Sequence, residues 1–163
     1  SPVSFIYSSN ALFAVIDGIV NMTYNGFTYL NTGVGDGIDI NGMSRQGSST
    51  TYLAANQGLF SDNGSFNSGT ASLSQIDFGD VLSPDYITIN DVSSSSSGLI
   101  AVAISDGTYG TIINNRFSLK GDTGLKTVHK VVFVGEDVWA FGHDLLKVSL
   151  LEYPIKLTTG SPL

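Results

Sequence analysis

Residues 111–121 read TIINNRFSLKG: a short apolar segment, a polar Asn114-Asn115 corner, a Phe-bearing segment and a closing glycine. Asn and Gly tolerate the positive φ angles that a two-residue hairpin turn requires, and β-branched and aromatic residues are typical of the flanking strands. The pattern therefore predicts a β-hairpin that reverses at Asn114-Asn115.

The same phrase occurs three more times, at residues 22–33 (MTYNGFTYLNTG), 52–64 (YLAANQGLFSDNG) and 132–142 (VFVGEDVWAFG). Two of the four hairpins are preceded by a further apolar segment that ends in an Asp-Gly turn, at Asp17-Gly18 and Asp106-Gly107. This is a three-stranded antiparallel meander used twice. The sequence therefore predicts an all-β chain of hairpins and meanders with little or no helix.

Two architectures remain open for these meanders. The repeat positions Phe27, Leu59, Phe117 and Val138 are 32, 58 and 21 residues apart, whereas a regular propeller keeps a period of roughly 40. A degenerate copy at residues 87–92 (ITINDV) would divide the longest gap. A propeller-like repeat and a jelly-roll barrel or β-sandwich are both consistent with this spacing.

The remaining segments complete the expected organisation of residues 1–163 as a single domain. The five-glycine stretch 33–47 and the serine run 93–97 are interpreted as loops, the second one flexible. Residues 99–104 (LIAVAI) are the most apolar stretch and are expected to form a buried strand, and residues 147–153 a last strand. The tail 158–163 is expected to fray, and the Ser1-Pro2 start suggests a piece of a longer or processed protein.

The composition limits the classes of partner. Charged residues make up only 13% of the chain, about half the usual ~25%, and Ser, Thr, Asn and 19 Gly replace them. The net charge of −7, with two Arg and five Lys, provides no basic stripe, so we expect neither nucleic-acid binding nor attachment to an anionic membrane. The chain has no apolar run long enough to span a bilayer, which predicts no membrane insertion.

The sequence offers little that points to catalysis. Without cysteine there is no disulfide, thiol nucleophile or Cys-ligated zinc, and no glycine loop precedes a helix that would cradle a phosphate, so we expect no cofactor. His129 in a Val-rich strand and His143 in a loop beside Asp144 are interpreted as structural or solvated. Glu136-Asp137 is interpreted as a hairpin turn. We expect a protein that is not an enzyme.

A faint cation-loop pattern is the one candidate for metal binding. Asp36, Asp39 and Asn41 place oxygen ligands close together, but the alternation of a calcium loop and its closing Glu are missing. We interpret this stretch as a structural turn, with a metal site as the weak alternative.

The positive candidates are binding residues. Glycan sites combine aromatic faces with Asn, Asp and Ser hydrogen bonds, because sugars present both C–H faces and hydroxyl groups. We single out the hairpin tip Asn114, Asn115 and Arg116, together with Tyr109 near a turn and the single Trp139, for which a core position is the favoured alternative. Further tyrosines near turns are Tyr29, Tyr52 and Tyr86.

Residues 53–64 and 101–121 resemble the degenerate blades of BNR-type and RCC1-type propellers, which also occur in virus and phage fibre or spike proteins. The resemblance implies a receptor-binding head at the virion surface or outside the cell, which binds a host-cell surface receptor or glycan and assembles as a homo-oligomer. A capsid-protrusion module and a polysaccharide-degrading domain with loop carboxylates are the alternatives.

Overall fold

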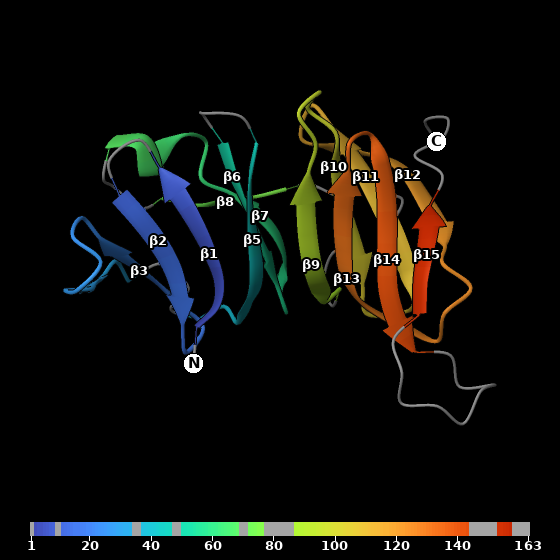
Figure 1. The fold of residues 1–163 in the computed structure, drawn as a ribbon, viewed down its shortest axis with the longest axis horizontal. Coiled ribbons are helices and arrows are strands. Elements are labelled where there is room, and N and C mark those ends of the chain that lie inside the picture. Colours follow the sequence, from blue (N-terminus) through green and yellow to red (C-terminus); the bar gives the residue numbers. More distant parts are fainter. Residues whose placement is uncertain are drawn as a thin grey trace.

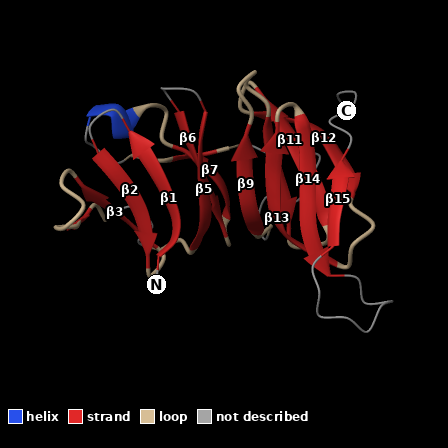
Figure 2. Ribbon diagram, in the orientation of Figure 1, coloured by secondary structure: helices blue, strands red, loops and turns tan. Residues whose placement is uncertain are grey.

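The computed structural model describes residues 2–8, 11–33, 37–46, 50–68, 72–76, 87–143 and 153–157. These residues form four antiparallel sheets, shown in Figures 1 and 2. Sheet 1 consists of β1 (Pro2–Ser8), β2 (Ala11–Ile16), β3 (Ile19–Thr23) and β4 (Leu30–Asn31). Sheet 2 consists of β5 (Ile40–Gln46), β6 (Thr50–Ala55), β7 (Gly58–Ser61) and β8 (Ser74–Gln75). Sheet 3 consists of β9 (Ile89–Ser94), β10 (Ile100–Ile104), β11 (Thr108–Ile113) and β12 (Arg116–Asp122). Sheet 4 consists of β13 (Thr127–Val134), β14 (Asp137–His143) and β15 (Tyr153–Leu157).

The all-β prediction is confirmed. The one helical element among the described residues is the short 3₁₀ turn η1 (Ser65–Ser68), drawn in blue in Figure 2. None of the described residues forms a helix with the length and apolar character needed to cross a bilayer. The strand expected at residues 99–104 is β10, which is buried throughout.

Each sheet is a meander whose strands follow one another in sequence order. The first strands of successive sheets pack side by side, β1 on β5, β5 on β9 and β9 on β13. Figure 1 shows β1 and β13 at the two ends of this row, with the other labelled strands of sheets 1 and 4 farther out. The first strands begin at Pro2, Ile40, Ile89 and Thr127, which are 38, 49 and 38 residues apart.

The uneven spacing seen in the sequence came from comparing unlike positions. Phe27 lies in the loop after β3, Leu59 in β7, Phe117 in β12 and Val138 in β14. The further copy suspected at residues 87–92 is not one, because these residues run into β9, the first strand of sheet 3, and that sheet already contains the hairpin at Phe117. The first strands therefore recur every 38 to 49 residues, around the period of roughly 40 that a propeller keeps, and of these strands only β13 overlaps a hairpin phrase.

Three apolar clusters fill the spaces between neighbouring sheets. Because side chains alternate along a strand, each central strand contributes to the clusters on both of its faces. On β6, Leu53 packs toward sheet 1 while Tyr52 and Ala54 pack toward sheet 3. The largest fully buried side chains are Phe13, Phe66, Leu53, Leu59, Ile89, Ile100, Ile104 and Ile112.

Polar side chains of the first strands bond to the free backbone edge of the strand in the next sheet. From β9, Asn90 Nδ2 donates to the carbonyl of Val128 at 2.6 Å, and Asp91 Oδ2 accepts the backbone N–H of Val131 at 3.0 Å. Ser93 Oγ accepts the N–H of Phe133 at 3.1 Å. These bonds occupy backbone groups that an edge strand would otherwise leave without a protein partner.

The same arrangement joins β9 to β5 on its other side. Ser94 Oγ donates to the carbonyl of Arg45 at 2.8 Å and lies 2.7 Å from Ser44 Oγ, while Asn41 Nδ2 donates to the carbonyl of Ile89 at 2.9 Å. The expectation of a solvated loop at residues 93–97 is therefore wrong for Ser93 and Ser94, which end β9 and connect three sheets.

The expectation of a loop over residues 33–47 is also wrong, because β5 runs through it. Gly42 lies inside this strand because the site has no room for a side chain. A Cβ at that position would lie 2.7 Å from Asp91 Oδ1. The glycine marks the close approach of two strands rather than a turn.

Two other local predictions need correction. The strand expected at Phe27–Leu30 begins only at Leu30, in β4, because Asn25 Oδ1 accepts the backbone N–H groups of Phe27 (2.8 Å) and Thr28 (2.9 Å) that a strand partner would take. His143 ends β14 instead of lying in a loop, and its ring centroid is 5.2 Å from that of His129. The last described strand is β15, and residues 144–152 and the tail 158–163 lie outside the described residues.

The Asp91 contact predicts a pH-dependent stability. Burial raises the pKa of Asp91 above its usual value of 3.8, against the smaller opposing effects of the Val131 N–H and the charge of Lys130. The folded state then binds the proton of Asp91 more tightly than the unfolded state does. The contribution of Asp91 to the free energy of unfolding is therefore full below pH 3.8 and is lost as pH rises through the raised pKa. In urea unfolding from pH 3 to 7, Asp91→Asn should gain stability relative to the wild type as pH rises.

Ser93→Ala is the matched control, because Ser93 makes the equivalent bond to β13 without titrating in this range. Its cost, about 0.5–1.5 kcal/mol for one hydrogen bond, should be the same at every pH. A stability difference between Asp91→Asn and the wild type that does not change with pH would contradict this account.

Candidate functional site

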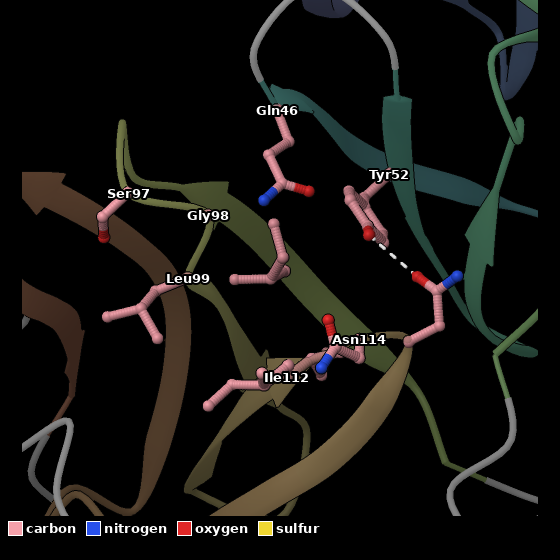
Figure 3. A pocket seen from close by; sticks show the side chains of 10 residues that line it. Gln46, Tyr52, Ser97, Gly98, Leu99, Ile112 and Asn114 are labelled. Atoms are coloured by element: carbon pink, nitrogen blue, oxygen red, sulfur yellow. Dashed lines mark hydrogen bonds between the residues drawn. The ribbon is translucent and has the colours of Figure 1, made fainter.

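A hollow of about 400 Å³ opens where sheets 2 and 3 meet. Its walls come from the end of β5, from β6, from the β9–β10 turn and from the tip of the β11–β12 hairpin, as Figure 3 shows. The lining residues are Gln46, Tyr52, Ser97, Gly98, Leu99, Ile100, Ile112, Ile113, Asn114 and Asn115. This volume lies in the range of small-molecule pockets, about 300–1,000 Å³.

The hairpin tip is shaped by its two asparagines. Ile113 pairs with Arg116, so Asn114 and Asn115 form a two-residue turn, and both have positive φ, 52° and 60°. This is the geometry of a type I′ turn, which matches the twist of the flanking strands. The predicted reversal at this corner is confirmed.

Tyr52 links the hairpin tip to sheet 2. Its side chain is only 4% exposed, and its hydroxyl donates to Asn115 Oδ1 at 2.9 Å, the dashed line in Figure 3. Burial, and to a smaller degree the negative charge of Asp62, raises the pKa of Tyr52. The hydroxyl is therefore protonated at neutral pH and can serve as a donor.

Gln46 and Asn114 point into the same space beside Tyr52 in Figure 3. Gly98 lies opposite Gln46 with a φ of +98°, and a Cβ there would lie 2.8 Å from Gln46 Nε2. A glycine at this position therefore leaves room for the glutamine side chain. Each carboxamide offers both donors and an acceptor.

Ser97 is held in place from sheet 4. Its hydroxyl donates to Glu136 Oε2 at 2.5 Å, and Ser96 Oγ is 3.5 Å from Glu136 Oε1. Ser95 closes the turn, because its Oγ accepts the N–H of Leu99 at 3.0 Å. Glu136 lies at the β13–β14 turn, as the sequence suggested, and there it anchors one wall of the pocket.

The pocket wall is polar and carries no formal charge. Its polar groups are carboxamides, hydroxyls and backbone. Leu99 and Ile113 provide apolar surface between them, whereas Ile100 and Ile112 are fully buried. None of the ten described lining residues is an Asp, Glu, His, Lys or Arg. Such a wall suits a neutral ligand that both donates and accepts hydrogen bonds.

The structure brings together only part of the predicted binding set. Asn114 and Asn115 line the pocket, and Arg116 is exposed next to them at the start of β12. Tyr109 is 6% exposed and packs in the cluster between sheets 3 and 4, where a Cβ on Gly121 would lie 2.7 Å from its hydroxyl oxygen. Trp139 lies on β14 of sheet 4, half-buried and away from the pocket.

The weak metal candidates do not form a described cluster. Asp36 lies outside the described residues. Asp39 and Asn41 are both bonded to Asn56, whose Nδ2 donates to Asp39 Oδ2 at 3.3 Å and whose Oδ1 accepts from Asn41 Nδ2 at 3.0 Å. Within the described residues, no three His, Cys, Asp or Glu side chains are grouped as a metal site would require.

A second hollow of about 430 Å³ lies where β5, β9 and β13 meet. Several of its polar side chains already bond to the strands on either side, Asn90, Asp91 and Ser93 to β13 and Asn41 to β9. We therefore regard it as a structural junction, and the pocket between sheets 2 and 3 as the candidate site.

Sequence reasoning missed Gln46 and the Ser97–Leu99 wall, and named Tyr52 only as a tyrosine near a turn. The signal for the wall is in the topology. In an antiparallel meander the first and third turns lie at the same end of the strands, which places the β9–β10 turn beside Asn114-Asn115. No local pattern, by contrast, indicates that Gln46 and Tyr52 of the preceding sheet lie beside these two turns.

Comparison with known proteins gives the fold and nothing further. No protein-family model and no curated protein matches the sequence. Solved structures that match include regucalcin from Agrobacterium tumefaciens, described as a calcium-binding protein, with TM-score 0.66 and 12% identity over 97% of this chain and 62% of its own. The Pan2 WD40 domain of Neurospora crassa matches with TM-score 0.66 and 12% identity, over 99% of this chain and 50% of its own. YCF48 from Cyanidioschyzon merolae matches with TM-score 0.67 and 12% identity, over 96% of this chain and 50% of its own.

These neighbours are β-propellers, and the chain spans about half of their length. The four sheets are therefore propeller-like blades, with the first strands on the inside. Of the two architectures left open by the sequence, the propeller-like one is confirmed and the sandwich or jelly-roll barrel is wrong. At such low identity the likeness extends to the fold alone.

The link between Tyr52 and the hairpin tip can be measured with a double-mutant cycle. Tyr52→Phe removes the donor, and Asn115→Gly removes the acceptor while keeping a residue that accepts a positive φ. The two changes should couple by about 0.5–1.5 kcal/mol in urea unfolding, the net value of one hydrogen bond. Additive effects would show that this contact does not hold the tip against sheet 2.

Proposed function

We propose that the chain is a binding module, not an enzyme, and that it recognises a neutral polyhydroxylated ligand of the glycan class in the pocket between sheets 2 and 3. The observation that carries the proposal is the set of side chains at the pocket: carboxamides of Gln46 and Asn114 beside the ring of Tyr52. Sugars present hydroxyls that both donate and accept, together with apolar C–H faces, and this wall offers a partner for each.

The uncharged wall favours binding over cleavage. Glycoside hydrolysis ordinarily uses two carboxyl groups that flank the scissile bond. The described lining residues provide amides, hydroxyls and aliphatic groups instead. A pocket of this kind holds a sugar without an acid or base to act on it.

In the setting suggested by the composition, the module would act as the receptor-binding head of a virion spike or fibre. The supports are the low charge, the richness in Ser, Thr, Asn and Gly, and the blade-like phrases that also occur in such proteins. The ligand would then be a host-cell surface glycan, reached outside the cell.

The proposal predicts a specific loss on removing Gln46. Gln46→Ala should weaken binding of the best ligand from a glycan array by about 5–10-fold, because one hydrogen bond is worth roughly 1 kcal/mol. Titration calorimetry or ligand-observed NMR would measure the change.

Gln75→Ala is the matched control. Gln75 is an exposed glutamine of the same sheet, on β8, and its Nε2 donates to the carbonyl of Gln57 instead of facing the pocket. It should leave affinity unchanged. A blank glycan array together with no detectable binding in solution would remove the proposal, and equal losses in both variants would remove the assigned site.

A further inference from the structure

The two histidines of the chain lie side by side on sheet 4. His129 is on β13 and His143 ends β14, the neighbouring strand in Figure 1, and both residues are half-buried. Their ring centroids are 5.2 Å apart, and the ring planes are inclined at 39°. Aromatic pairs prefer near-parallel offset stacking or a perpendicular edge-to-face arrangement. The intermediate angle indicates that stacking alone does not set this contact.

A β-bulge brings the two rings together. The pairing of β13 with β14 shifts register at His129, which is the extra residue between two strand pairs. Gly142 permits the close approach of the strands here, because a Cβ at that position would collide with the carbonyl oxygen of Thr127. Bulges re-aim a side chain and are over-represented next to functional sites. Here the bulged residue is a histidine, and its ring lies next to that of His143.

The spacing of the rings fits two imidazoles on one metal ion. In a tetrahedral site the metal–nitrogen distance is about 2.0–2.1 Å, and an imidazole centroid lies about 1 Å behind its ligating nitrogen, so two rings on one ion have centroids about 5 Å apart. The observed separation of 5.2 Å agrees with this value. Imidazole is also a ligand that suits Cu²⁺, Ni²⁺ and Zn²⁺. The pair therefore has the spacing and the chemistry of a chelate.

The surroundings allow an ion to reach the pair. His129 lines the hollow of about 430 Å³ where β5, β9 and β13 meet, and Asp91 lines the same hollow, where an ionised carboxyl group favours a cation. The nearby cations are Lys130 and Lys126, whose backbone N–H donates to the carbonyl of His143 at 3.0 Å. Both lysines are exposed, so solvent and salt screen their repulsion of an ion.

A metal site made of protein ligands alone would need further side chains, and within the described ranges no third His, Cys, Asp or Glu is grouped with this pair. An ion held by two imidazoles instead keeps its other positions for water or for an exogenous ligand, as open metal sites do.

We infer that His129 and His143 together bind one transition-metal ion of the class that prefers imidazole, Cu²⁺ most tightly and Ni²⁺ and Zn²⁺ less so. One nitrogen of each ring ligates the ion, and the other remains for the hydrogen bond that orients the ring. The chain has no cysteine to compete for the ion. Neither histidine lines the pocket between sheets 2 and 3, so this inference does not depend on the proposed ligand.

Calorimetric titration of the untagged chain with Cu²⁺ tests the inference. The expected result is one ion per chain, with weaker binding of Zn²⁺ at the same site and no competition from Ca²⁺ or Mg²⁺, which prefer oxygen ligands. His129→Asn and His143→Asn should each reduce the Cu²⁺ affinity about 10-fold or more, because the second imidazole then no longer acts at a high effective concentration. The absence of saturable Cu²⁺ binding by the wild type would overturn the proposal, and so would variants that keep the wild-type affinity.

Electron paramagnetic resonance of the Cu²⁺-loaded chain tests whether both rings hold the same ion. Two imidazole nitrogens should couple to Cu²⁺ in the wild type, and one in either variant. A single coupled nitrogen in the wild type would overturn the shared site, because the rings would then touch without a common ion. The wild-type spectrum decides this point without any variant.

Asp137→Asn is the matched control. Asp137 is an exposed carboxylate at the start of β14 of the same sheet, so its replacement should leave the Cu²⁺ affinity and the spectrum unchanged. An affinity loss in this control equal to that of the histidine variants would show that general negative charge binds the ion, and would overturn the assignment to the pair. Far-UV circular dichroism checks that all three variants retain the wild-type strand content.

Discussion

The joining of sheets 2, 3 and 4 depends on how the first strands β5, β9 and β13 satisfy their free backbone edges. An inner strand pairs with only one neighbour in its own sheet, so half of its backbone groups would face the next strand without a partner. Here β9 contributes Asn90, Asp91 and Ser93 to the backbone of β13, and Ser94 to that of β5. The sheets are joined by these directed bonds at the inner edge and by apolar packing farther out, and the two together fix how each sheet is oriented on the next.

The outer parts of each sheet and the Val-rich inner strand β13 could be predicted from the sequence, whereas the inner strands β5 and β9 could not. Hairpins at Asn56-Gln57, Asn114-Asn115 and Gly135-Glu136 have local signals, because residues that tolerate positive φ or tight turns stand between β-branched strands. The strands β5 (INGMSRQ) and β9 (INDVSS) are rich in Gly, Ser, Asn and Asp. These residue types are typical of loops, yet here their side chains bond to neighbouring strands. The function of the polar groups is visible only once the sheets are placed side by side.

The candidate site divides along the same line. Its hairpin tip follows from two adjacent asparagines, whereas Gln46, Tyr52 and the turn at Ser97 come from separate parts of the chain and meet only through the packing of sheets 2 and 3. Tyr109 shows the converse error. It lies near a turn in sequence and has the chemistry of a binding residue, but its strand position directs it into the cluster between sheets 3 and 4. Whether a residue faces the core or the pocket depends on which face of its strand it occupies. The sequence does not determine this face where the strand pairing shifts register.

The tie between Ser97 and Glu136 crosses from the pocket wall to the next sheet. The position of that wall is therefore set partly by a surface corner that does not touch the pocket interior. Insertions or exchanges in this corner could change the width of the opening while the lining itself stays the same. The geometry of the opening is thus coupled to the β13–β14 turn, which contributes no lining residue.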